Sequence, residues 1–280
     1  MYDAIELMLP AFLVCLVLTG MHAYLGLHIL ARGVIFVDLA LAQIAALGAT
    51  VGYLFGFGLH SEGSYLCSLS FALIGAAIFT LSRSQSKRVP QEAMIGLVYA
   101  ISAAALVLVL SRSPEGGEEL KSLLVGHLLF VSWKEILYVL VLYSAVGLIH
   151  YFARKRFMQL SFDPENPIET GTNTALYDLL FYGTFALVVT SSVELGGVLL
   201  VFSFLIAPAI CARLLCANFR SSLAVAWGVG TAVSALGIIL SYLLDLPSGA
   251  AVVCSFAPAV ILAMLVSSGR GGGVIGAQIR

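Results

Sequence analysis

The sequence predicts an all-α, polytopic membrane protein with eight or nine transmembrane helices. Apolar residues make up 60 % of its 280 positions, and the mean hydropathy is +1.03. Only 10 % of the residues are charged, whereas a soluble domain has about 25 %. A soluble fold could not cover this much apolar surface. Since a spanning helix needs about 20 apolar residues, the chain has room for about nine such helices and short loops.

Charged residues, glycines and prolines divide the chain into nine apolar segments. The sixth and seventh are separated only by Glu194 and Leu195, so one of them is alternatively a half-helix or re-entrant piece, which leaves eight spans. We expect a single transmembrane domain over residues 1–268 and a flexible, Gly-rich tail over residues 269–280. The segments cover residues 8–30, 33–56, 64–82, 92–111, 135–153, 177–193, 196–214, 222–243 and 249–267.

Basic residues are distributed unevenly between the two sets of alternate loops. One set contains only three of the 14 Lys and Arg residues, Arg112, Lys121 and Lys134. The positive-inside rule assigns the other set to the cytoplasm, so we expect the N-terminus outside and the C-terminus inside. The richer set consists of Arg32, Arg83, Lys87, Arg88, Arg154, Lys155, Arg156, Arg213, Arg220, Arg270 and Arg280.

Several motifs that would indicate an enzyme do not occur. The sequence contains no GxxxxGK[ST] phosphate loop, no HExxH zinc motif and no GxSxG nucleophile elbow. The net charge of −1 offers no basic field for nucleic acid. What remains is a multi-helix pathway or scaffold that takes any energy from another protein.

Two further features concern packing and partners. Gly48, Gly52 and Gly56 form a GxxxGxxxG face, which allows close helix packing either within the chain or between two copies. Residues 154–176 form the longest polar stretch, and they lie on the predicted cytoplasmic side. Pro164 and Pro167 restrict the backbone there, and we expect this inner loop to hold a cytoplasmic partner.

Five segments, in order along the chain, resemble a known family. They are EAMIGLVYAISAAALVLVLS (92–111), LLVGHLLFVSWKEI (123–136), FDPE (162–165), GVLLVFSFLIAPAICARLL (197–215) and SYLLDLPSGAAVV (241–253). Each is similar to a signature of the permease subunits of metal-ion ABC importers, the ABC-3 family of zinc, manganese and iron permeases.

The resemblance implies a type II ABC importer-like permease that carries a divalent metal ion, zinc or manganese, across a bacterial or archaeal inner membrane. It implies a homodimer, two copies of a cytoplasmic ABC ATPase subunit that hydrolyse ATP, and an extracytoplasmic metal-binding protein. This chain would bind no cofactor of its own. A coupling helix after the FDPE box would contact the ATPase through Asp163, Glu165 and Glu169. The alternatives are a permease for an iron chelate or small organic cofactor, and a self-contained channel or secondary transporter.

One departure from the family concerns the metal path. Family members commonly carry an Asp and a His four residues apart on an early helix, whereas the matching segment IFVDLALAQIAALG (35–48) has Leu39 and Gln43 there. An aspartate lies one position earlier, at Asp38. We predict that Asp38, Gln43 and His22 line the path. The alternatives are an interfacial Arg32–Asp38 pair, an interhelical hydrogen bond from Gln43 and a neutral, hydrogen-bonded His22.

Polar residues at the predicted outer ends form a second candidate surface. Two histidines and three carboxylates lie there, and we predict that they contact the metal-binding protein. A solvated surface without this role is the alternative. The five residues are His60, Glu62, His127, Glu194 and Asp245.

Overall fold

The computed structural model describes residues 2–58, 61–84, 89–111, 126, 128–164 and 173–269. Within these ranges it is helical, with no strand, and eight helices are long and apolar enough to cross a membrane. The predicted all-α polytopic fold is therefore confirmed, and the number of long apolar helices lies within the expected eight or nine. The elements are α1 (Tyr2–Arg32), α2 (Val37–Leu54), α3 (Glu62–Ser84), α4 (Gln91–Leu110), the 3-10 turn η1 (Leu128–Phe130), α6 (Trp133–Phe162), α7 (Thr174–Leu215), α8 (Phe219–Leu244) and α9 (Ser248–Gly269).

Helix α7 consists of two arms joined at Gly197, where the backbone leaves the helical region at φ 74° and ψ 165°. Helix α1 contacts both arms at nearly the same level. The His28 ring lies 5.8 Å from the Phe181 ring in the first arm, and Gly26 lies against the backbone of Leu205 in the second. A straight helix would separate residues 181 and 205 by about 36 Å. The chain therefore reverses at Gly197, and the arms correspond to the predicted sixth and seventh segments.

The reversal is built from backbone packed against backbone. Gly126, in the chain before α6, has a φ of 68°. A Cβ atom there would lie 2.2 Å from the carbonyl carbon of Gly196. A side chain at position 126 would collide with the backbone of the turn, so this contact depends on a glycine there.

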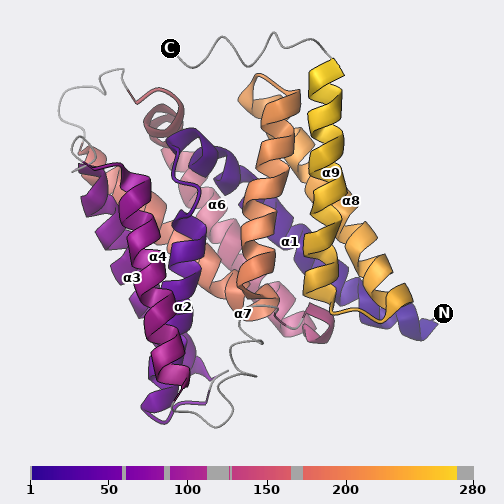
Figure 1. Cartoon of the computed structure of the whole chain (residues 1–280), viewed down its shortest axis with the longest axis horizontal. Helices are drawn as coiled ribbons and strands as arrows, with labels where there is room; N and C mark the ends of the chain where they lie inside the picture. Colours follow the sequence, from indigo (N-terminus) through magenta and orange to yellow (C-terminus); the bar gives the residue numbers. More distant parts are fainter. Residues whose placement is uncertain are drawn as a thin grey trace.

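Helix α7 also joins the two halves of the bundle. Helices α2, α3 and α4 pack together on one side, and α8 and α9 lie on the other (Figure 1). Helix α7 contacts α2 and α3 in the first group, α8 and α9 in the second, and α1 and α6 as well. The start of α1 and the end of α9 lie at opposite ends of the bundle (Figure 1).

The glycine face on α2 packs within the chain. A Cβ atom at Gly48 would come within 2.8 Å of the Cys67 carbonyl oxygen, and one at Gly52 within 3.2 Å of the Ser64 Cα. The Ser68 hydroxyl donates a hydrogen bond of 2.8 Å to the Ala45 carbonyl across this contact. The small residues therefore let α2 and α3 approach closely, which answers the choice between internal packing and a dimer seam for Gly48 and Gly52.

Helix α6 is longer than the sequence suggested. It continues through residues 154–162, which we had expected to belong to the inner loop. The reason is that Phe157 and Leu160 give this basic stretch a buried face. The helix begins at a capping box, in which the Ser132 side chain accepts from the Glu135 amide and Glu135 accepts from the Ser132 amide.

We predict that Gly197→Ala destabilises the protein. A Cβ atom at φ 74° and ψ 165° is sterically strained, and such a backbone costs a non-glycine residue about 1–3 kcal/mol. Thermal unfolding in detergent, followed by size-exclusion chromatography, measures the effect. Gly183→Ala is the matched control, since Gly183 lies in the same helix and its added Cβ meets nothing within 4 Å. Equal stability of the two variants would contradict a strained turn at Gly197.

Candidate functional site

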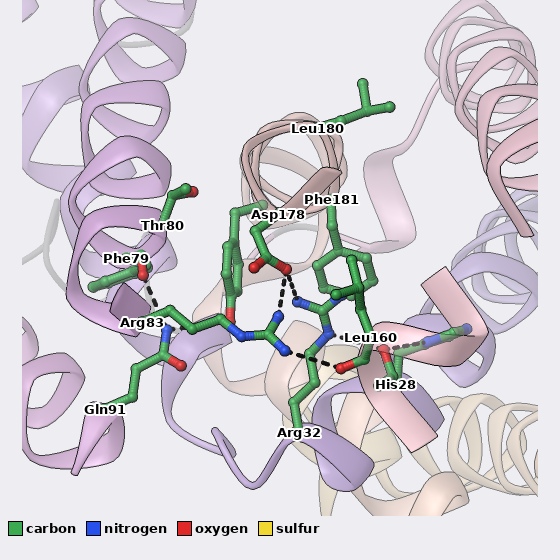
Figure 2. Close-up of polar contacts among 12 residues, drawn as sticks. His28, Arg32, Phe79, Thr80, Arg83, Gln91, Leu160, Asp178, Leu180 and Phe181 are labelled. Carbon is green, nitrogen blue, oxygen red and sulfur yellow. Dashed lines mark hydrogen bonds and ion pairs between the residues drawn. The ribbon is translucent and has the colours of Figure 1, made fainter. Parts of the chain in front are cut away.

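Two arginines and one aspartate meet where α1 and α3 end and α7 begins (Figure 2). Arg32 Nη1 lies 2.9 Å from Asp178 Oδ1, and Arg83 Nη1 contacts the same oxygen. Arg83 Nη2 donates to the Leu160 carbonyl at 2.9 Å, and Arg32 Nε donates to the Ser161 hydroxyl at 2.9 Å. We call Arg32, Arg83 and Asp178 the arginine–aspartate cluster. It connects the ends of four helices, because Leu160 and Ser161 belong to α6.

The arginine–aspartate cluster is buried and carries more positive than negative charge. The Arg32 and Asp178 side chains are 2 % and 8 % exposed, whereas Arg83 is 23 % exposed. The Arg32 guanidinium stacks on the Phe181 ring at 3.8 Å. Such stacking stabilises a cation away from water. With two cations and one carboxylate, the cluster has a net charge of +1, and both arginines share Asp178 as their counter-charge.

Sequence reasoning missed this cluster. It treated Arg32 and Arg83 as loop residues and offered Asp38 as the partner of Arg32. The structure pairs Arg32 with Asp178 instead, 146 residues away. Asp178 is the one acidic residue in the predicted segment 177–193. An ionisable residue within a spanning segment usually has a partner or a function, so its position was an available signal.

His22 belongs to a chain of hydrogen bonds between α1, α6 and α7. Its Nδ1 lies 2.8 Å from the Leu18 carbonyl, and its Nε2 lies 3.2 Å from the Ser192 hydroxyl. Ser192 in turn contacts the Tyr143 hydroxyl. His22 is fully buried, and both ring nitrogens have partners. A metal ion would have to displace one of these hydrogen bonds to bind His22.

Asp38 has no such partners. Its side chain is fully buried, and neither carboxylate oxygen accepts a hydrogen bond. It lies within electrostatic range of Tyr143, which links it to the surroundings of His22. A charge in this position costs several kcal/mol unless something stabilises it. Among the predicted path residues, Asp38 is therefore the one whose buried side-chain oxygens have no hydrogen-bond partner among the residues that the structure describes.

Gln43 lies elsewhere on the same helix. It is 6 % exposed and lies between Leu39 and Leu47, both half-buried, on a face of α2 that the rest of the chain covers incompletely. Because successive residues turn by about 100°, Asp38 and Gln43 point about 140° apart. They do not converge on one ion within a single chain. Among the described residues, no three His, Cys, Asp or Glu side chains gather in a group that could hold a metal.

The predicted outer residues that the structure describes lie at one end of the bundle. Glu62 begins α3, Glu194 lies three residues before the turn at Gly197, and Asp245 caps the end of α8 in a left-handed conformation with φ 52°. This end is opposite the arginine–aspartate cluster (Figure 1). Glu62, Glu194 and Asp245 are all exposed. His60 and His127 lie outside the described residues.

The signature around Asp245 forms the tight α8–α9 connection. The Ser241 hydroxyl donates to the Leu246 carbonyl at 2.7 Å, and the Leu246 amide donates to the Ser241 carbonyl at 3.0 Å. The segment therefore has a structural role, whatever it contacts outside. On the predicted inner side, Asp163 caps the end of α6 with its amide donating to the Gln159 carbonyl at 3.0 Å. Glu165 and Glu169 lie outside the described residues.

A bundle of apolar helices that are long enough to cross a membrane defines the class of polytopic membrane proteins. The chain belongs to the ABC 3 transport family, whose model matches residues 4–267. A protein from Haemophilus influenzae named "Probable iron transport system membrane protein" is 28 % identical over 95 % of both chains. The "Manganese transport system membrane protein MntC" of Listeria monocytogenes is 27 % identical over 82 % of this chain and 79 % of its own.

A solved structure shows the same fold. A chain of "PsaBC from Streptococcus pneumoniae in complex with Fab" matches with a TM-score of 0.77 at 19 % identity, covering 94 % of this chain and 93 % of that one. The family match over residues 4–267 confirms the resemblance inferred from the five sequence segments.

We predict that Asp178→Asn destabilises the protein by about 3–5 kcal/mol, because it leaves two buried arginines without a counter-charge. Arg83→Gln is the matched comparison: it leaves the Arg32–Asp178 pair intact and removes the more exposed cation. The midpoint of thermal unfolding in detergent should fall far more for Asp178→Asn. Equal losses would mean that the hydrogen-bond count, and not the charge balance, determines the stability.

Proposed function

We propose that this chain is the membrane-spanning permease subunit of an ATP-driven importer for a divalent metal ion. The observation that carries the proposal is the family membership over residues 4–267. The iron and manganese systems named for its relatives support the cargo. Two copies of the chain would form the path, with two ATPase subunits in the cytoplasm and a metal-binding protein outside.

We infer that manganese or ferrous iron is preferred over zinc. The two non-histidine residues of the predicted path, Asp38 and Gln43, offer a carboxylate and an amide oxygen. Oxygen ligands suit manganese, whereas zinc is commonly held by nitrogen and sulfur. Asp38 is the leading candidate for contact with the ion, since its oxygens have no other partner.

The proposed location is a bacterial or archaeal inner membrane, with the N-terminus outside and the C-terminus in the cytoplasm. Helices α1 and α3, whose last turns contain Arg32 and Arg83, finish at the end of the bundle where α9 finishes, opposite the start of α1 (Figure 1). The positive-inside rule favours the cytoplasm for that end. The metal-binding protein would then meet Glu62, Glu194 and Asp245, together with His60 and His127.

We further infer how the inner loop transmits force. The loop between Asp163 and Asn173 connects α6 to α7, and Asp178 lies on the first turns of α7. Movement of the loop by the ATPase would pull on Asp178 and, through the shared oxygen, on Arg32 and Arg83. The arginine–aspartate cluster thus gives the loop a direct connection to α1 and α3.

A permease for a metal chelate is the second candidate. It is favoured by Leu39 and Gln43, which occupy the positions where the family commonly has the Asp and His pair. A chelate brings its own ligands and needs fewer from the protein.

Uptake by the complete complex in proteoliposomes tests the function and the role of Asp38. We expect ATP-dependent accumulation of Mn²⁺ that requires the binding protein. Asp38→Asn should reduce it by tenfold or more and Gln43→Leu by a few-fold, while thermal stability stays unchanged or rises because a buried unpaired charge is lost. Thr50→Val is the control, since the Thr50 hydroxyl donates only to the Ala46 carbonyl one turn earlier.

Three outcomes would count against these statements. Uptake without the ATPase would indicate a self-contained transporter. Uptake of a chelate but not of the free ion would favour the second candidate. Normal uptake by Asp38→Asn would remove that residue from the path.

We predict that Glu165→Lys together with Glu169→Lys lowers co-purification of the ATPase several-fold. The changes reverse the charge of the inner loop where the ATPase is proposed to bind. Quantitative immunoblotting of the purified complex measures the association. Glu62→Lys reverses a charge at the opposite end of the bundle and should leave it unchanged. If the double variant retains the ATPase as well as Glu62→Lys does, the loop is not the contact.

A further inference from the structure

A groove of about 580 Å³ lies between α1, α6 and α8, and none of the predicted path residues lines it. Its two ends differ in chemistry. Arg154 of α6 and Arg220 of α8 line one end, and Gly147 and Trp227 line the other. Seven residues separate the two members on each helix, which corresponds to about 10 Å along a helix axis. The groove thus has a cationic end and an apolar end.

Contacts among the three helices fix this arrangement. The Trp227 Nε1 donates to the Gly20 carbonyl at 3.0 Å, which ties the apolar end of the groove to α1. Nearer the arginines, the Tyr24 hydroxyl lies 3.3 Å from His150 Nδ1, and the Tyr24 ring lies 6.1 Å from that of Phe219. Because α6 and α8 run in opposite directions, their arginines come to the same end.

The two arginines place positive charge at this end of the groove. Within the described part of the chain, no carboxylate forms an ion pair with Arg154 or Arg220. Arg154 is exposed and stacks on the Tyr151 ring at 4.3 Å. Two unneutralised cations at the mouth of an apolar groove are complementary to an anionic headgroup with an attached hydrocarbon chain.

The depth of the groove comes from missing side chains. An added Cβ atom at Gly20 or at Gly147 would meet nothing within 4 Å. These glycines leave open a space that faces the outside of the helix bundle, where lipid surrounds a membrane protein. Basic pockets between helices on the cytoplasmic side bind anionic lipid headgroups in this way.

We propose that the groove is a binding site for one anionic phospholipid of the leaflet next to Arg154 and Arg220. The phosphate lies between the two arginines, and an acyl chain follows the groove past Leu223 to Trp227. Lipid bound in the groove holds α1 against α6 and α8 at the lipid-facing surface of the bundle.

Fluorescence of Trp227 tests the proposal, because the chain has only two tryptophans and Trp133→Phe leaves Trp227 alone. The protein is placed in phosphatidylcholine bilayers that contain a small fraction of brominated phosphatidylglycerol or of brominated phosphatidylcholine. We expect stronger quenching by the anionic lipid at equal mole fraction. Replacing Arg154 or Arg220 by Gln should reduce that preference about fivefold each.

Three controls separate the site from general effects. Gly147→Leu fills the groove without touching the arginines and should abolish the preference, whereas Gly96→Leu on α4, also at a position with open space, should not. Arg213→Gln removes an exposed cation outside the groove and should leave the preference intact. Equal quenching by the two lipids would overturn the proposal, as would protection of Trp227 from both, which would indicate that another protein chain covers the groove.

Discussion

Two arginines share one carboxylate oxygen at the point where α1 and α3 end and α7 begins. Without Asp178, Arg32 and Arg83 would face each other in a region that water barely reaches, and like charges repel strongly at low dielectric. With Asp178 in place, the first arm of α7 lies between the two halves of the bundle. Since α7 contacts nearly every other helix, the position of this arm determines how the halves meet.

The reversal at Gly197 lies at the opposite end of the first arm of α7. The first arm is fixed by charge at Asp178, and the second packs through small contacts such as Gly26 against Leu205. The two arms of α7 are held by different kinds of interaction. A charged group specifies one partner geometry, whereas the packing of Gly26 on the Leu205 backbone is non-directional. A permease that alternates between two states would need both properties.

Much of the fold was predictable, because a run of about 20 apolar residues has few alternatives to a membrane helix. The helix ends were predictable to within a few residues, except at the start of α1, which begins six residues early, and at the end of α6, where the basic residues 154–156 concealed a continuing buried face. Glu194 and Leu195 marked the break in α7 approximately. The backbone reverses a little later, at Gly197, because only a glycine tolerates that conformation.

The candidate site was less predictable, since it depends on which side chains meet. Nothing in the sequence pairs Arg32 with Asp178, and the nearby Asp38 was the natural choice by distance along the chain. Only the rotation of α2 decides that Asp38 turns inward, away from Arg32. The hydrogen bonds of His22 depend likewise on Ser192, 170 residues later. The local sequence pattern contains no information about which distant residues form such contacts.

The sequence distance within the arginine–aspartate cluster bears on how the protein is made. Asp178 follows Arg83 by 95 residues, which at about 5–20 residues per second is a delay of roughly 5–20 s during synthesis. Both arginines reach the membrane before their counter-charge exists. The ends of α1 and α3 must therefore stay at the water interface until α7 is inserted. Assembly of the two halves is accordingly a late step, which follows insertion of the individual helices.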